Sequence, residues 1–60
     1  NPHHGLIKNL ASLRDNDPDL AKTIAEQVFD NTLVEAGILD DPKKMLGRVY
    51  ELMEKLAGKP

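Results

Sequence analysis

Three pairs of a capping residue and a proline divide this 60-residue sequence into three segments. The pairs are Asn1-Pro2, Asp17-Pro18 and Asp41-Pro42. Asn and Asp side chains accept a hydrogen bond from an unpaired N–H at a helix start. Proline is best tolerated at the first helical position, because the N–H that it lacks has no partner there. Each pair therefore predicts the beginning of a helix.

The predicted helix ends lie at residues that break or close helices. Asp15-Asn16 interrupts the first segment, while Gly37 and Gly58 can adopt the left-handed conformation that closes a helix. We therefore expect three helices, over about residues 2–14, 18–36 and 42–57. Because no stretch alternates like a strand, the predicted fold class is all-α, as a single domain over residues 1–60.

The middle helix is apolar around more than half of its circumference. Successive residues advance by about 100° around a helix, so its weakly polar and apolar residues cover roughly 220°. These residues are Leu20, Ala21, Ile24, Ala25, Val28, Phe29, Thr32, Leu33 and Ala36. One neighbouring helix covers a stripe of about 100° or somewhat more, so the middle helix needs a second contact. Since the chain has no cysteine and no metal-ligand cluster to brace so small a domain, a partner chain is expected.

The short link over residues 37–41 predicts that the second and third helices run antiparallel as a hairpin. A hairpin with excess apolar surface is half of a four-helix bundle, which we expect a second chain to complete. Ile38 and Leu39 either pack on the start of the following helix or lie at the end of the intermolecular bundle. Arg48 is either a surface residue or the partner of a carboxylate on a neighbouring helix.

Most other functions are excluded by composition and motifs. Eight Lys and Arg are interspersed with ten Asp and Glu, so there is no basic face for nucleic acid. No apolar run approaches the ~20 residues that cross a bilayer. The sequence has no Ser–His–Asp or Cys–His set, no glycine-rich phosphate loop and no HExxH motif. We therefore expect no catalysis, no cofactor, no nucleic acid and no membrane partner in this segment.

Two side-chain clusters are candidates for metal binding, and neither fits. One places four acidic residues at the first, third, fifth and twelfth positions of a calcium-binding loop: Asp15, Asp17, Asp19 and Glu26. The glycine that such a loop requires at its sixth position is replaced by Leu20. The other cluster is His3 and His4, which as neighbours on a helix point about 100° apart and do not readily share a metal ion. We expect no metal site.

Charged side chains are predicted to cover the solvated faces of the helices. The expected surface residues are Lys22, Asp30, Glu35, Lys43, Lys44, Glu51, Glu54 and Lys55.

Four short stretches follow one another along almost the whole chain. They are Asn1-Pro2-x-His4-x-Leu6-Ile7-Lys8, a segment from Leu20-Ala21 through Ala25-Glu26-Gln27-Val28-Phe29-Asp30-Asn31, the turn Ala36-Gly37-Ile38-Leu39-Asp40-Asp41-Pro42, and Gly47-Arg48-x-x-Glu51-Leu52. In order and spacing they are similar to the NPxHxLIK segment, the following long helix, the AGLLEDP-like turn and the GRxxEL helix of the heat-shock protein 90 chaperone family. The chain thus resembles the C-terminal dimerisation segment of that family, of the bacterial or organellar type.

This resemblance implies a homodimer. In that family each protomer has an N-terminal ATPase domain, a middle domain and a C-terminal domain, and the last two helices of each protomer form an intermolecular four-helix bundle. The first helix would brace the hairpin within its own protomer. Carried over by position, the implied interface residues are Phe29, Leu33, Ile38, Leu39, Leu46, Val49, Tyr50, Met53 and Leu56.

The resemblance also implies a biological setting. The segment would tether two protomers of an ATP-dependent chaperone that acts on client proteins in the stress response, while the nucleotide site lies in a domain absent from this chain. The compartment would be the cytoplasm if the protein is bacterial, or an organelle such as the mitochondrion. Because the sequence starts Asn1-Pro2-His3-His4, without a methionine, we expect it to be a piece of a longer protein.

Two other interpretations stay open. The first is a monomeric helical binding module whose apolar groove receives a helix of a different protein. The second is a designed mini-domain that borrows this sequence, because repeated capping signals are also used in design.

Overall fold

The computed structural model describes the backbone of residues 2–58 and the side chains of residues 4–58. Its elements are helices α1 (Pro2–Asn16), α2 (Pro18–Glu35) and α3 (Lys43–Ala57). No strand occurs in this part of the chain. The predicted all-α fold with three helices is confirmed.

A single residue, Asp17, separates α1 from α2. Its carboxylate accepts a hydrogen bond from the backbone N–H of Leu20 at 3.2 Å, and Pro18 occupies the first turn of α2. The predicted Asp17-Pro18 helix start is therefore confirmed.

The predicted interruption of α1 at Asp15-Asn16 is wrong, because α1 continues through Asn16. The side-chain amide of Asn16 donates to the carbonyl of Ser12 at 3.2 Å, so it supports the last turn of α1 instead of breaking it. The predicted cap at Asn1 lies outside the described residues.

Gly37 ends α2 in the predicted left-handed conformation, with φ of 72°. The N–H of Gly37 donates to the carbonyl of Val34, and the N–H of Ile38 donates to the carbonyl of Leu33, both at 3.0 Å. This pair of bonds is the Schellman motif, which satisfies carbonyls that the end of a helix leaves unpaired. The helix itself ends at Glu35, one residue before the predicted bound.

Two predictions at the ends of α3 are corrected. The N-cap is Pro42 instead of Asp41, so α3 begins one residue late. The Asp41 carboxylate still accepts a hydrogen bond from the N–H of Lys43 at 3.0 Å, because a side chain two residues before the helix can reach that donor. Gly58 has a right-handed conformation with φ of −80°, and its N–H donates to the carbonyl of Glu54 at 2.9 Å. The last turn therefore closes without the expected left-handed glycine.

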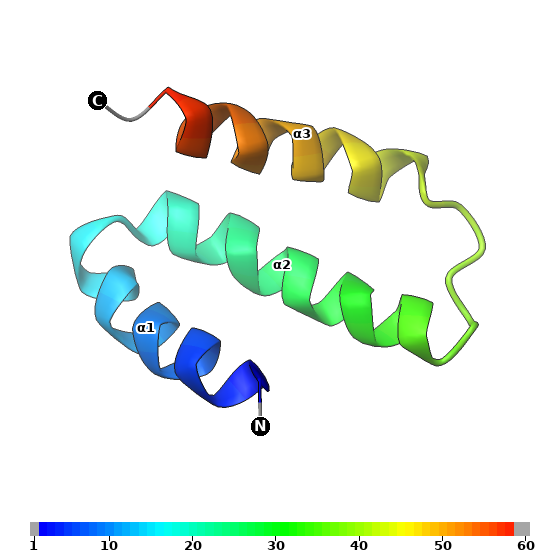
Figure 1. Cartoon of the computed structure of the whole chain (residues 1–60), viewed down its shortest axis with the longest axis horizontal. Coiled ribbons are helices and arrows are strands. Elements are labelled where there is room, and N and C mark those ends of the chain that lie inside the picture. The colour runs from blue at the N-terminus through cyan, green and yellow to red at the C-terminus, as the bar shows by residue number, and fades with distance from the viewer. Residues whose placement is uncertain (1, 59–60) are drawn as a thin grey trace.

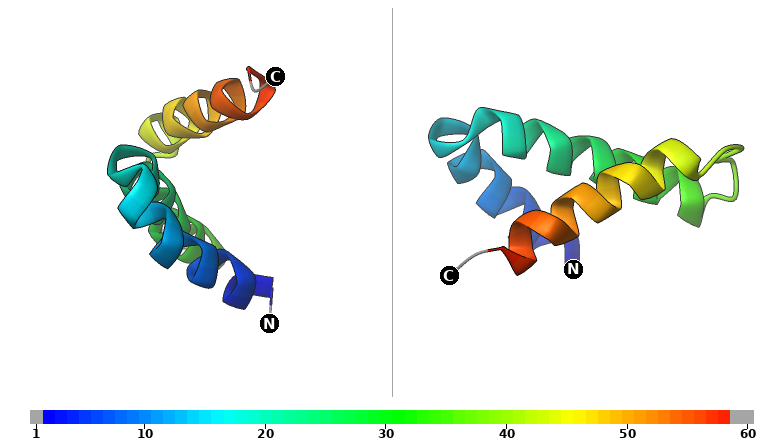
Figure 2. Two further views of the ribbon diagram at one scale, coloured as in Figure 1. Left: turned by 90° about the vertical axis from the view of Figure 1, so that its left-hand side faces the viewer. Right: turned by 90° about the horizontal axis from the view of Figure 1, so that it is seen from above.

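Figure 1 shows α2 in the middle, with α1 packed along one side and α3 along the other. The helices α2 and α3 run antiparallel, as the short link predicted. The left view of Figure 2 shows that α1 and α3 both lean toward the same side of α2, so the three helices form a curved layer. Within the described residues, α1 and α3 are not packed against each other.

The core of this layer is small. Ala21 is the only buried apolar residue among those described, at 7% exposed, and no large side chain there is fully buried. The helix α2 is covered from two sides, which agrees with the prediction that one neighbour cannot cover its apolar circumference. Phe29 nevertheless stays 63% exposed. A large share of the apolar surface of this chain is thus in contact with solvent.

Candidate association surface

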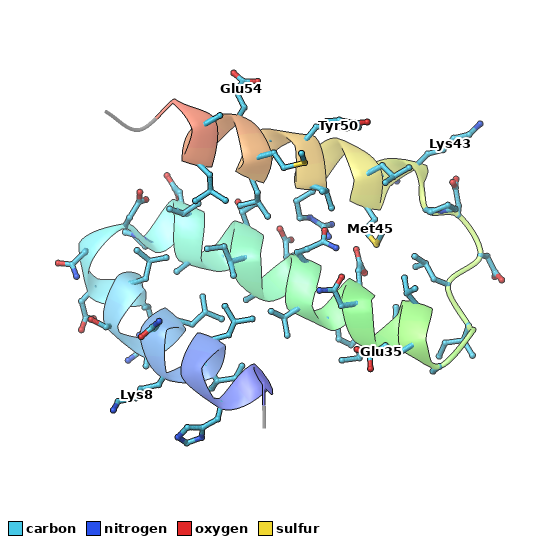
Figure 3. All side chains as sticks on the ribbon, in the orientation of Figure 1. Lys8, Glu35, Lys43, Met45, Tyr50 and Glu54 are labelled. Atoms are coloured by element: carbon cyan, nitrogen blue, oxygen red, sulfur yellow. The ribbon has the colours of Figure 1, made fainter. Side chains whose placement is uncertain are left out.

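The helix α3 carries two rows of residues with different surroundings. The row that faces α2 is half-buried and has the helical spacing i, i+3, i+4 and i+7: Met45, Arg48, Val49 and Leu52. The second row is exposed and consists of large apolar side chains: Leu46, Tyr50, Met53 and Leu56, the last of which shares the angular position of Met45 and Val49 and is exposed near the end of α3. We call this second row the α3 stripe. No residue of α3 is buried, and Tyr50 points away from α2 (Figure 3).

The α3 stripe has the pattern of a helix that packs along another helix. Its members are three or four residues apart, so they follow one side of α3 over most of its length. Tyr50 is 68% exposed and Met53 is 54% exposed. A row of exposed apolar side chains of this kind is a candidate surface for a partner.

Arg48 connects α3 to α2 through a polar network. Its Nη1 donates to Asp30 Oδ2 at 2.6 Å and to Gln27 Oε1 at 3.4 Å, and its Nε lies 4.0 Å from Glu26 Oε1. The Gln27 amide in turn donates to Asn31 Oδ1 at 2.9 Å. Of the two interpretations of Arg48, the structure shows the ion pair with a neighbouring helix.

This network is partly shielded from water. The side chains of Arg48 and Asp30 are 21% and 18% exposed, and Gln27 is buried. The prediction that Asp30 is a solvated surface charge is therefore wrong. The sequence contained a usable signal, because Glu26 and Asp30 are four residues apart and present two carboxylates on one side of α2. Without the position of α3, that signal could not identify Arg48 as the partner.

The implied interface residues lie in different places. Phe29 lines a groove of about 410 Å³ together with Lys22, Ala25 and Arg48. Arg48, which borders this groove, and Met53 of the α3 stripe are about 140° apart around α3. Phe29 and the α3 stripe therefore lie beside opposite edges of the contact between α2 and α3. Ile38 is exposed in the link, while Leu33, Leu39 and Val49 are half-buried. The structure does not bring Phe29 together with the α3 stripe.

A separate apolar groove of about 430 Å³ lies between α1 and α2. It is lined by Ile7, Leu10, Ala11, Arg14, Pro18, Ala21, Lys22 and Ala25. The two charged residues among them, Arg14 and Lys22, are both cationic.

Within the described part of the chain, no three His, Cys, Asp or Glu side chains are grouped so that they could hold a metal ion. None of the helices there combines the length and the apolarity that crossing a membrane requires.

No family model matches the chain, and no solved structure matches it. Its sequence is 47% identical over 55 residues to mitochondrial heat shock protein 75 kDa of Bos taurus, covering 92% of this chain. It is 44% identical over 55 residues to the chaperone protein HtpG of Desulfitobacterium hafniense, again covering 92% of this chain. It is 34% identical over 59 residues to the mitochondrial TNF receptor-associated protein 1 homolog of Dictyostelium discoideum, covering 98%.

The chain spans only 8% or 9% of the length of these three relatives. The similarity extends over nearly the whole of this chain, however, and reaches both mitochondrial and bacterial proteins. By this similarity the chain, as one short segment, belongs to the heat-shock protein 90 family.

Proposed function

We propose that this segment is the homodimerisation module of an ATP-dependent molecular chaperone. Two copies would associate through α2 and α3 as an intermolecular four-helix bundle, and the α3 stripe would form its centre. The observation that carries the proposal is the α3 stripe itself, because four large apolar side chains are exposed along a helix that buries none of its residues. Two of the relatives named above are called chaperone or heat shock proteins, which supports the setting.

The geometry favours a symmetric contact. If two copies place the same stripe against each other, each residue of the stripe meets apolar side chains of the partner and the assembly closes as a dimer. Moving an exposed Leu or Met side chain out of water contributes on the order of 1 kcal/mol or more. Phe29 lies beside the other edge of the α2–α3 contact, so it stays a predicted interface residue outside this central contact.

Dimerisation would act by tethering. Two chaperone arms held at one end have a raised effective concentration for each other, which permits transient closure without strong contacts between them. Catalysis and client binding would belong to the remainder of the parent protein. Since the named relatives are mitochondrial and bacterial, the proposed compartment is a mitochondrion or the bacterial cytoplasm.

Sedimentation equilibrium of the 60-residue chain across micromolar to millimolar concentration tests the proposal. We expect a monomer–dimer equilibrium that Leu46→Gln with Met53→Gln weakens at least tenfold, because both changes remove apolar contact and keep good helix formers. The matched control is Lys44→Gln on the same helix, which should change the dissociation constant less than twofold. A chain that stays monomeric at every concentration contradicts the proposal.

The second candidate is a monomeric module that binds a helix of another protein. The groove between α1 and α2 favours it, because an apolar floor bordered by Arg14 and Lys22 suits an amphipathic helix with acidic flanks. A monomeric chain that binds a Leu-rich peptide flanked by Glu, and does not bind the same peptide flanked by Lys, would favour this candidate over the dimer.

A further inference from the structure

The side of α3 that packs against α2 is not centred on the middle of the apolar side of α3. At about 100° per residue, its apolar residues occupy an arc of roughly 160° whose middle lies between Val49 and Met53. The half-buried row that faces α2 is centred near Leu52, about 70° away from that middle. As a result, the charged Arg48 lies inside the contact with α2, while Leu46 and Tyr50 lie outside it.

Apolar burial alone would favour a different rotation. If α3 rolled about its own axis by this angle, Leu46 and Met53 would move toward α2 and Arg48 would move into water. Burial of apolar surface is the larger and less directional contribution to helix packing, so the observed rotation needs a specific cause. No residue of α3 is buried, so tight apolar packing of α3 is not that cause.

The polar network is the feature that distinguishes the observed rotation. Arg48 reaches Asp30 at 2.6 Å and Gln27 at 3.4 Å only while it faces α2. Rolling α3 would leave the partly shielded Asp30 carboxylate and the buried Gln27 amide without this donor. A polar group left unpaired in such a position costs more than its hydrogen bond contributes. In some proteins, pairs of this kind select one arrangement among several of similar stability.

We propose that Arg48, paired with Asp30, is the positioning residue that holds α3 in the rotation that leaves the α3 stripe free for a second copy. This inference rests on the proposed dimer. Without the pair, the hairpin still forms, but Leu46 and Met53 turn inward and the surface for the partner shrinks. Arg48 thus acts on dimerisation through the orientation of α3, and it need not touch the second copy.

Removing both charges of the pair tests this role in the intact 60-residue chain. In Arg48→Ala with Asp30→Ala, the carboxylate of the network that stays is Glu26, which is half exposed to water, and no large apolar group is added. We expect the dissociation constant of the dimer to rise at least tenfold, while helix content at dilution stays within a tenth of that of the unmodified chain. Nuclear Overhauser contacts from the Met53 methyl group to α2 side chains should be stronger than in the unmodified monomer.

Two further variants make the test specific. The reversed pair, Arg48→Glu with Asp30→Arg, restores an ion pair at the same place and should keep the dissociation constant within threefold. If the Ala pair loses its helices, the neutral pair Arg48→Gln with Asp30→Asn keeps side-chain size and carries the same expectation. The inference is overturned if the folded variant that lacks both charges has the same association constant and the same Met53 contacts as the unmodified chain. If the unmodified chain proves monomeric, the dimer proposal fails, and the Met53 contacts still decide whether α3 has rolled.

Discussion

The contact of α1 with α2 and the contact of α3 with α2 are built from different chemistry. In the contact of α1 with α2 lies Ala21, the one buried apolar residue among those described. Ala21, Ile7 and Leu10 line the apolar groove between these two helices. The second has the Arg48–Asp30 ion pair and only half-buried apolar residues. Apolar packing is tolerant of rotation, whereas a hydrogen-bonded pair is directional. The α1 contact therefore holds the buried apolar residue of the fold, while the α3 contact depends on a directional pair that fixes the rotation of α3.

Disrupting the contact of α1 with α2 should lower the stability of the chain the most. Ala21→Asp places a carboxylate at a position that is only 7% exposed. We expect it to remove about 3 kcal/mol of stability, which is enough to unfold so small a chain. Loss of the helical signal in circular dichroism measures this. The control is Ala25→Asp, one turn further along α2 at an exposed position, which should cost about 0.5 kcal/mol. Equal losses would mean that α1 does not bury Ala21.

Disrupting the contact of α3 with α2 should lower the stability of the chain by a smaller amount. Asp30→Asn removes the charge that Arg48 contacts, and we expect a loss of about 1 kcal/mol, because the pair is 18–21% exposed and Glu26 stays 4.0 Å from Arg48. Urea unfolding at concentrations where the chain is monomeric measures it. Asp40→Asn, at an exposed position in the link, is the matched control and should change little. The comparison would be undermined if both substitutions had the same effect.

Two glycine substitutions within the hairpin should change the stability of the chain in opposite directions. Gly37→Ala forces a side chain into φ of 72° and should destabilise the chain by about 1 kcal/mol. Gly47→Ala lies inside α3 with open space around it, and should stabilise the helix by about 0.5 kcal/mol. Thermal unfolding of the monomer measures both. A Gly37→Ala chain as stable as the unmodified one would show that the left-handed closure of α2 is dispensable.

Local features of the fold were largely predictable. The hydrogen bond from Leu20 to Asp17 and the left-handed Gly37 depend on chemistry within a few residues, so their sequence signals are direct. The errors at the helix ends were also local. Asn16 extended α1, and the cap of α3 moved from Asp41 to Pro42, because Asn and Asp side chains can satisfy backbone groups in more than one way.

The candidate site was predictable only in part. The spacing of Leu46, Tyr50 and Met53 along the sequence identifies an apolar side of α3, and these residues are exposed as a surface for a partner requires. The same spacing could not separate this side from Phe29, which lies beside the other edge of the α2–α3 contact. Helical periodicity predicts which residues share a side of one helix, but it does not predict which side is turned toward a neighbouring helix.

The positions of the helices and of their apolar residues follow from the amino-acid sequence, because capping, turn formation and periodicity act over a few neighbouring residues. The rotation of α3 about its axis, in contrast, follows only from how α3 packs on α2. That rotation depends on whether Arg48 meets Asp30 across 18 residues of chain, and a charged side chain has no preferred partner until the fold brings one within reach. In the proposed dimer, the Arg48–Asp30 pair would thereby decide which apolar residues of α3 stay open to a second copy.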